Sequence, residues 1–420
     1  MCKLEAEQAN LVRTPSFIFS FLLLFAIEAL AQTNVSGYIL SNTTWTLAGS
    51  PYIVTGNALV INGVTLTIEP GVVVKFDSTK ALQVDGELIA NGTAQNRITF
   101  TSTQAVPAPG GWGRIQFSDI SVDAVFDAQG RYQSGSVFRY CDILYAGGIA
   151  NSAAVYCDTS APYFSHCNVL RSATAGIYFI NSIGRVDSSS IKYCAGAGLY
   201  FYNPPTADLI VKNDSIEYNG GGVISSSSTA VFSNASIHNN VFSSNGGPGN
   251  ISAINIRANS CTISDNIFLS NTGGAIKGNY GAIAITDNVF MSNASGTIFL
   301  DAGTPSTTNL TVTNNHFENN IGVIYAYSSY SSIQGNTFFA NQYYPLYGGI
   351  WGGNDDYILI NIRSSGGQGV FMNNTVDSNY TAATLNNFYL IWIYNTRFEI
   401  AHNVRLSKNR WRLLNTFPLK

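Results

Sequence analysis

Charged side chains are scarce in this sequence, where they make up 11% of 420 residues and leave a formal net charge of −3. The chain therefore lacks a basic field of the kind that recruits nucleic acid. Its four His residues are scattered, and none has the spacing of a metal-ligand pair. A Gly-x-Ser-x-Gly elbow and a glycine-rich phosphate loop are both absent, so nucleophilic and nucleotide chemistry are unsupported.

Long apolar runs are also rare, and the one clear example is FIFSFLLLFAIEALA, from Phe17 to Ala31. It ends in a small-x-small cleavage pattern, so we expect residues 1–31 to be a secretory signal peptide. The alternative is an amino-terminal membrane anchor, but the run is short for a span of about 20 residues and contains Glu28. No later stretch is long and apolar enough to cross a bilayer. The sequence thus predicts a secreted, extracellular protein without a transmembrane segment after cleavage.

One short pattern, Asn-x-Phe-x-x-Asn, dominates the second half of the sequence. It occurs six times, once with Val in place of Phe, and its apolar positions are 21 to 38 residues apart. These positions are Phe242, Phe268, Phe290, Phe317, Phe338 and Val376. A period in the twenties without helical amphipathicity indicates a solenoid, in which each repeat buries its apolar face only by stacking on its neighbours.

The same interval continues upstream of the first copy. Ile143, Val169, Ile191 and Ile216 are 26, 22 and 25 residues apart, and Phe242 follows 26 residues later. Short apolar runs broken by Asn, Gly and Ser are typical of short strands joined by tight turns. We predict an all-β, right-handed, single-stranded parallel β-helix of roughly 13–15 coils, about 60–70 Å long at the strand spacing. The Phe, Ile and Val column fills the core, and the Asn columns pass amide hydrogen bonds between coils.

Five Cys residues remain after the predicted signal peptide, so in an oxidising compartment at least one thiol is free or joined between chains. Cys141 and Cys167 each lie two residues before the core residue of adjacent coils. Their Cα separation is then expected near the disulfide range. Either a bridge or two stacked thiols fits this spacing.

The amino-terminal block carries a resemblance to a known family. TLTIEPGVVVKF at 65–76, GELIANGT at 86–93, ITFTS at 98–102 and GWG at 111–113 resemble the opening coils of secreted right-handed parallel β-helix repeat proteins of the pectate lyase-like superfamily. With the later repeats, the resemblance covers roughly residues 45–405. The combination also resembles the β-helix ectodomains of large single-span proteins of epithelial cell contacts. We expect a cap at 32–50, the β-helix at 51–404, and a basic tail or truncated end at 405–420.

Because many β-helix proteins of this superfamily resemble polysaccharide lyases or hydrolases, the sequence has to be searched for their catalytic residues. Lyases of this shape hold Ca²⁺ with clustered carboxylates and use Arg or Lys as a base, whereas the hydrolases use paired Asp residues. Asp355 and Asp356, followed by Arg363, are the candidate catalytic residues. The Gly-His-Gly element of the hydrolases is absent, and the spacing is too short to place Arg363 one coil away. A solvated loop is therefore the favoured interpretation.

Asp265 and Asp287 form a second acidic candidate, because stacked coils would place them about 5 Å apart. Like charges at that distance raise a pKa or recruit a cation, and Ca²⁺ suits oxygen ligands. Two carboxylates flanked by amides make a thin coordination shell. We therefore expect no cofactor, with this pair as the alternative Ca²⁺ site.

The 38-residue interval between Phe338 and Val376 must hold an inserted loop or a further turn. Insertions in a solenoid project from one face and often carry binding. This one contains Tyr343, Tyr344, Tyr347 and Trp351. Such rings either contact a ligand or fill wider coils. Our leading hypothesis is a non-catalytic recognition or adhesion module for a carbohydrate or a cell-surface protein. The alternatives are a polysaccharide lyase or glycoside hydrolase, and a structural spacer.

Ten Asn-x-Ser/Thr sequons permit N-glycosylation if the host route supplies it. Asn293 is a poor acceptor if its amide is stacked in a ladder.

Overall fold

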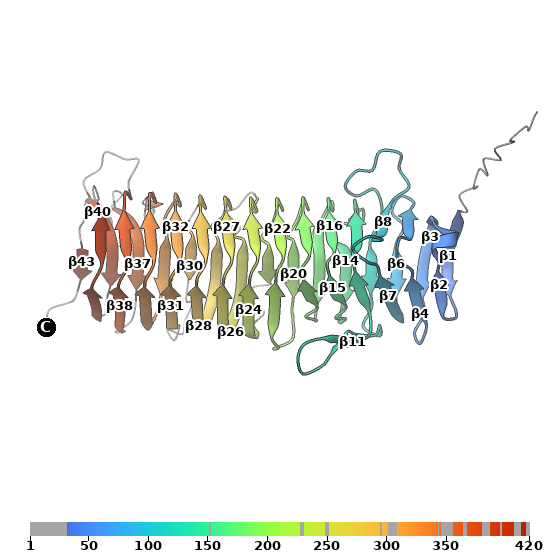
Figure 1. Ribbon diagram of the computed structural model, residues 1–420, viewed down its shortest axis with the longest axis horizontal. Coiled ribbons are helices and arrows are strands. Elements are labelled where there is room, and N and C mark those ends of the chain that lie inside the picture. Colours follow the sequence, from blue (N-terminus) through green and yellow to red (C-terminus); the bar gives the residue numbers. More distant parts are fainter. Residues whose placement is uncertain are drawn as a thin grey trace, which may run out of the picture. The chain divides into compact units, whose positions relative to one another are not determined.

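The computed structural model describes residues 32–150, 153–226, 231–247, 252–294, 296–300, 309–342, 344–345, 356–363, 368–379, 387–394, 397–406 and 413–416. Within these ranges every regular element is a β-strand, apart from a 3-10 turn, η1 (Leu47–Gly49). Equivalent strands of successive coils pair in parallel to form one continuous stack (Figure 1). The predicted all-β parallel solenoid is confirmed.

The strands form three columns, with each strand paired to the equivalent strand of the next coil. The first column contains fifteen strands: β1 (Thr33–Ile39), β3 (Tyr52–Val60), β5 (Val73–Phe76), β8 (Ile98–Ser102), β13 (Cys141–Leu144), β16 (Asn168–Leu170), β19 (Ser190–Lys192), β22 (Ser215–Glu217), β25 (Val241–Ser243), β27 (Ile267–Leu269), β29 (Val289–Met291), β32 (His316–Glu318), β35 (Thr337–Phe339), β39 (Thr375–Asp377) and β42 (Val404–Leu406).

The second column also starts with β1 and β3. It continues through β6 (Leu82–Val84), β9 (Ile115–Phe117), β14 (Ala153–Asp158), β17 (Ala175–Ile180), β20 (Leu199–Tyr202), β23 (Ile224–Ser226), β26 (Ile254–Ser264), β28 (Ile276–Thr286), β30 (Ile298–Leu300), β33 (Ile324–Tyr327), β37 (Asp356–Arg363), β40 (Asn387–Tyr394) and β43 (Leu413–Thr416).

The third column shares β26 and β28 with the second. Its other members are β2 (Thr43–Trp45), β4 (Thr65–Ile68), β7 (Glu87–Asn91), β12 (Val137–Arg139), β15 (Tyr163–Ser165), β18 (Arg185–Asp187), β21 (Leu209–Lys212), β24 (Phe232–His238), β31 (Asn309–Thr313), β34 (Tyr330–Gln334), β38 (Gln368–Met372) and β41 (Arg397–Ala401). Two antiparallel pairings lie outside the columns, β10 (Val125–Phe126) with β11 (Tyr132–Ser134), and β36 (Tyr344–Pro345) with β37.

The core register predicted from the sequence is confirmed residue by residue. In the first column the ten predicted core residues from Ile143 to Val376 pair in order, each with its counterpart one coil on. All of them are fully buried. The Phe rings between Phe242 and Phe338 stack with centroids 4.8–5.1 Å apart. One strand spacing per coil therefore brings each ring into contact with the next.

Two asparagine ladders flank this column. The first ladder position lies two residues before the core residue and the second lies three after it. The first holds Asn240, Asn266, Asn288, Asn315, Asn336, Asn374 and Asn403, and the second holds Asn219, Asn245, Asn271, Asn293, Asn320, Asn341 and Asn379.

Each ladder amide links two coils in the same way. Its Nδ2 donates to the Oδ1 of the next Asn at 2.9–3.2 Å, and that same oxygen also accepts the backbone N–H of the donating residue. The predicted amide ladder is confirmed. Because Asn293 and Asn379 are both buried within it, these two sequons are poor glycan acceptors.

The cysteine bridge predicted as one alternative is not what the structure shows. Cys141 and Cys167 are buried free thiols, so the structure has the other alternative, the stacked pair. Both occupy first-ladder positions, where a hydrogen-bond donor is needed. Cys167 Sγ donates to the carbonyl of Phe138 at 3.4 Å, and Cys141 Sγ donates to the carbonyl of Ala90 at 3.4 Å.

The predicted signal peptide lies outside the described residues. In the described part of the chain, no helix is long and apolar enough to cross a membrane. The stretch predicted as a cap contains β1, β2 and η1, and β1 and β2 pair with β3 and β4 of the following coil.

Candidate functional site

Two columns of left-handed corner residues frame the first strand column. The first corner column comprises Tyr140, His166, Ser188, Asn213, Asn239, Asp265, Asp287, Asn314, Gly335, Asn373 and His402. The second comprises Tyr145, Arg171, Tyr193, Tyr218, Ser244, Ser270, Ser292, Asn319, Ala340 and Ser378. All have φ between 47° and 65°. Asn, Asp and Gly tolerate this conformation best, whereas bulky side chains in it are strained by about 1 kcal/mol or more.

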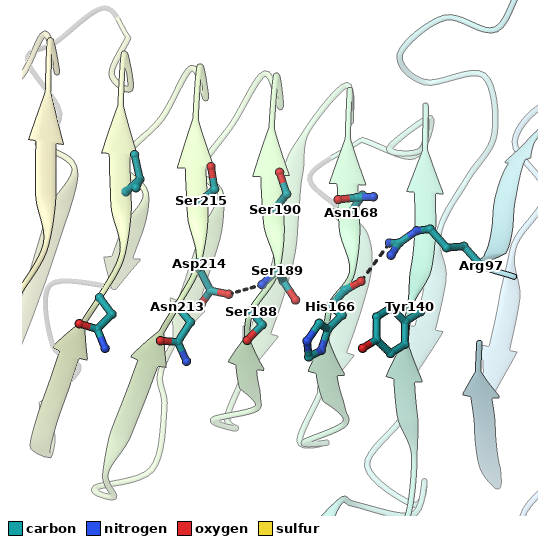
Figure 2. Close-up of a pocket in the computed structure, with 12 residues that line it drawn as sticks. Arg97, Tyr140, His166, Asn168, Ser188, Ser189, Ser190, Asn213, Asp214 and Ser215 are labelled. Atoms are coloured by element: carbon teal, nitrogen blue, oxygen red, sulfur yellow. Dashed lines mark hydrogen bonds between the residues drawn. The ribbon is translucent and has the colours of Figure 1, made fainter. Parts of the chain in front are cut away.

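A shallow groove of about 390 Å³ follows the first corner column from Tyr140 to Asn239 (Figure 2). Its wall on the strand side is made by Asn168, Ser190 and Ser215. Its lining is mainly hydroxyl, amide and aromatic, so it offers hydrogen-bonding groups and a ring face rather than an apolar cavity.

Arg97 lies at one end of the groove and is held in place on three sides (Figure 2). Its Nε donates to Asp142 Oδ1 at 2.8 Å, and its Nη2 donates to the carbonyls of Cys141 and His166 at 3.0 and 2.9 Å. The guanidinium also lies 6.0 Å from the centre of the Tyr140 ring. Because the ion pair neutralises its charge and fixes its position, Arg97 presents a rigid, locally neutral edge.

Tyr140 and His166 form an aromatic step beside Arg97. Their ring centroids are 4.6 Å apart and the planes are tilted by 30°. His166 is exposed, and its Nδ1 lies 2.9 Å from Ser165 Oγ. Both residues have positive φ, 47° for Tyr140 and 56° for His166. In this short stretch the corner therefore carries rings although its backbone favours Asn, Asp or Gly.

The floor of the groove contains a buried acid, Asp214. Its side chain is 2% exposed, and its Oδ1 accepts the backbone N–H of Ser189 at 2.7 Å. Burial raises the pKa of Asp214 well above its usual range. Because the carboxyl group of Asp214 is buried, it supports the backbone under the groove and does not contact a ligand in it.

The second corner column forms the opposite edge of the same strand column. The Tyr193 and Tyr218 rings stack at 5.0 Å with planes 9° apart, and the Arg171 guanidinium lies 5.3 Å from the Tyr193 centroid. Both Tyr side chains are 48% exposed. Three consecutive coils thus present a cation and two rings to solvent.

A third aromatic column lies on the second strand column. Tyr156, Tyr178 and Tyr200 follow one another at 5.4 and 4.8 Å, and the Arg114 guanidinium lies 4.3 Å from the Tyr156 ring. Burial, with a smaller contribution from the neighbouring tyrosines, raises the pKa of Tyr178 to about 12. These rings are half-buried, so they stabilise the sheet surface as well as exposing ring edges.

The predicted binding residues of the inserted loop mostly lie outside the described residues, as is the case for Tyr343, Tyr347 and Trp351. Tyr344 is in β36, and only its backbone is described. The described aromatic columns instead centre on residues 140–218. Their signal in the sequence is the interval of 25 residues from Tyr193 to Tyr218, which equals that from Ile191 to Ile216.

The predicted catalytic alternative falls at the edge of the same insertion. Asp355 lies outside the described residues, while β37 begins at Asp356 and ends at Arg363. The strand thus separates Asp356 and Arg363 rather than bringing them together, and their side chains are not described.

Asp265 and Asp287 occupy neighbouring positions of the first corner column and are exposed. Their left-handed backbone explains the residue type without a ligand, because Asp tolerates this conformation. Among the described residues, no group of three or more His, Cys, Asp or Glu side chains is placed to hold a metal ion.

Comparison with known proteins supports the class that the fold defines. Residues 152–309 match the family described as a right handed beta helix region, and residues 37–121 match a pectate-lyase like beta helix domain. The chain is a right-handed parallel β-helix protein.

One curated protein with significant similarity is Protein bark beetle of Drosophila melanogaster. It is 42% identical over 66 residues, which are 16% of this chain and 2% of that protein. The match therefore spans a small fraction of the length of that relative.

Solved structures with a similar backbone include a mutant of the periplasmic alginate epimerase AlgG. The two chains are 10% identical with a TM-score of 0.46, and the match covers 89% of this chain and 85% of that one. A tailspike protein mutant of E. coli bacteriophage HK620, in complex with pentasaccharide, is 13% identical with a TM-score of 0.35, and the match covers 86% and 72% of the two chains.

Proposed function

We propose that the β-helix is a non-catalytic extracellular recognition module whose contact surface is the first strand column between residues 140 and 218, with a carbohydrate as the ligand. The observation that carries this proposal is the concentration of Tyr, His and Arg at left-handed corners between residues 140 and 218, whereas later corners are Asn, Asp, Ser, Gly or Ala with the exception of His402. A residue that opposes the local backbone preference, in a fold that otherwise follows it, points to selection for something other than folding.

The chemistry of this surface favours binding of neutral, hydroxyl-rich molecules. Arg97 is paired with Asp142, and Asp214 is sealed beneath the floor. What remains accessible is a set of hydroxyls, amides and rings, together with the exposed guanidinium of Arg171. A sugar supplies hydroxyl groups and C–H faces that match the uncharged groups. Two ring edges on either side of a rigid strand column also suit a ligand that lies across several coils.

Rigidity supports recognition by reducing the ordering cost of binding. The strands under the surface are fixed by parallel pairing, and the corner rings are fixed by stacking on one another. The surface is therefore largely formed before a ligand arrives. A cell-surface protein is the alternative partner, because Tyr and Arg are also enriched at the centres of protein interfaces.

The proposal is tested by measuring binding of the full chain, expressed for secretion, to a panel of neutral and acidic polysaccharides. We expect binding that weakens at least tenfold in Tyr140→Ala and in the double variant Tyr193→Ala/Tyr218→Ala. Tyr178→Ala, on the second strand column, is the matched control and should bind like the wild type. Equal losses in all three variants would place the contact elsewhere.

Turnover is measured on the same panel, with and without Ca²⁺. If the chain depolymerises a polysaccharide and the variant Asp355→Ala/Asp356→Ala does not, the recognition proposal is wrong and the protein is an enzyme. Neither binding nor turnover on any polysaccharide would leave a protein partner or a structural spacer.

A further inference from the structure

The first ladder changes chemistry beneath the groove. From Asn240 onward every residue in it is Asn, and each Nδ2 donates to the backbone carbonyl three residues before the preceding ladder residue. Asn240, for example, donates to the carbonyl of Val211 at 3.0 Å. Cys167 follows the same rule, since its Sγ donates to the carbonyl of Phe138, three residues before Cys141. Ser189 departs from it, because its Oγ donates to the carbonyl of Asp187 at 3.0 Å, but it too supplies a donor. The residues around Asp214 in the ladder thus all act as donors.

Asp214 occupies this position and, as a carboxylate, has no donor to offer. Its backbone N–H donates to Asn240 Oδ1 at 2.9 Å, and its Oδ1 accepts the Ser189 N–H, so it is in register with the ladder. Its Oδ2 takes the place of an Asn Nδ2. Among the described residues, that buried oxygen has no hydrogen-bond partner.

The register of the stack identifies what surrounds Asp214 Oδ2. The two acceptors that an Nδ2 contacts at this point are the Oδ1 of the next ladder residue, here Asn240, and the carbonyl three residues before the previous one, here Val186. A carboxylate would place its Oδ2 against two other oxygens in a buried space with no donor between them, which is repulsive and leaves Oδ2 unsatisfied.

We propose that Asp214 is a protonated carboxylic acid at neutral pH, whose Oδ2–H donates within the ladder in place of an asparagine amide, so that the joint between the coils under the groove depends on one bound proton. The proposal rests on the ladder alone and does not depend on the ligand of the groove.

The charged and titratable groups around Asp214 fit a neutral acid. Lys212 of β21 is paired with Asp187 of β18 through a 3.2 Å contact, so it is not a free counter-charge for Asp214. Arg97 is committed to Asp142, and Cys167 is a buried thiol. On the far side, Asn240 is uncharged and His238 lies on β24. Burial raises the pKa of Asp214, and Asp187 and Cys167 add to that increase, against the Ser189 N–H and Lys212, which lower it.

A bound proton makes folding stability depend on pH in a defined direction. In the unfolded chain Asp214 titrates near its usual value of about 3.9. Above that pH the unfolded state releases the proton while the folded state keeps it, so stability falls as pH rises until the folded pKa is passed. The full contribution is present below about pH 4. The loss approaches tenfold in the ratio of folded to unfolded protein per pH unit.

The first test compares thermal unfolding midpoints of the full chain and Asp214→Asn between pH 4 and pH 8. Asn supplies the missing donor without a proton, so the midpoint difference in favour of Asp214→Asn should grow steadily with pH. Asp265→Asn makes the same chemical change at an exposed corner and should follow the wild type. Parallel curves for the wild type and Asp214→Asn would overturn the proposal.

The second test observes the proton directly. Infrared spectra at pH 7 should show a protonated carboxyl band that is absent from Asp214→Asn and retained in Asp265→Asn. A wild-type spectrum without such a band at pH 7 means that Asp214 is ionised and the proposal is wrong, whatever the stability of the variant.

Discussion

The coils from β13 to β22 and those from β25 to β35 have the same strand pairing but differ at most of their core, ladder and corner positions. In the later coils both ladder positions hold Asn, the core holds stacked Phe rings, and most corners hold Asn, Asp, Ser or Gly. In the earlier coils the first ladder holds Cys141, Cys167, Ser189 and Asp214, and most corners hold Tyr, His or Arg, the exceptions being Ser188 and Asn213.

This difference separates what the fold requires from what it permits. Parallel pairing and an apolar core are common to both regions, so they are sufficient to continue the stack. The asparagine ladder is an additional feature, found in the later coils, where both ladder positions hold Asn. In the earlier coils the ladder positions carry weaker or proton-dependent donors, while the exposed corners carry rings that the backbone does not favour.

The largest effect is expected from Asn288→Ala, which breaks the ladder in its regular region. The change removes the acceptor of the Asn266 backbone N–H and of its Nδ2, and the donor to the carbonyl of Ile263. Leaving such buried groups unsatisfied costs about 1–3 kcal/mol each, so we expect a loss of about 3–5 kcal/mol. Denaturant unfolding measures it. Asn255→Ala, on the outer face of β26, should change stability by less than about 0.5 kcal/mol.

The architecture and the ladder are predictable from the sequence because they repeat. Each coil has an apolar residue at the position of Phe242, and the later coils also repeat Asn240, so a spacing of 21 to 27 residues between regular copies gives the register without knowledge of the structure. The surface is harder to predict. Aromatic residues are dense in the carboxy-terminal third of the sequence, yet density does not give a residue's position within a coil. Tyr193 and Tyr218 become visible as a pair only when they are placed two residues after Ile191 and Ile216.

The cysteine prediction met a similar limit. Spacing placed Cys141 and Cys167 in one column correctly, but the preference between a bridge and two thiols depends on what the column does. Because that column is a ladder, each thiol has a backbone carbonyl to which it donates. A bridge would remove both donors.

A smaller effect is expected from Cys167→Ala in the earlier coils. The S–H group is a weak donor and the volume change is small, so we expect a loss of about 1 kcal/mol, well below that of Asn288→Ala. Alkylation of the unfolded, unreduced wild-type chain should also modify both Cys141 and Cys167. Protection of that pair together would show a bridge, and a loss of stability equal to that of Asn288→Ala would contradict the contrast between the two regions.

The smallest effect on stability is expected where the effect on binding is large. In the double variant Tyr193→Asn/Tyr218→Asn, relief of two left-handed Tyr residues offsets the lost ring stacking, so the unfolding free energy should stay within about 0.5 kcal/mol of the wild type. Carbohydrate binding should nevertheless be lost. The reverse exchange, Ser270→Tyr/Ser292→Tyr, places rings at the same corners of regular coils. Since added strain is again offset by ring stacking, the unfolding free energy should stay within about 0.5 kcal/mol of the wild type, and no binding should be created. If the Asn variant were strongly destabilised instead, the corner rings would be structural, and the division between a folding region and a recognition region would be wrong.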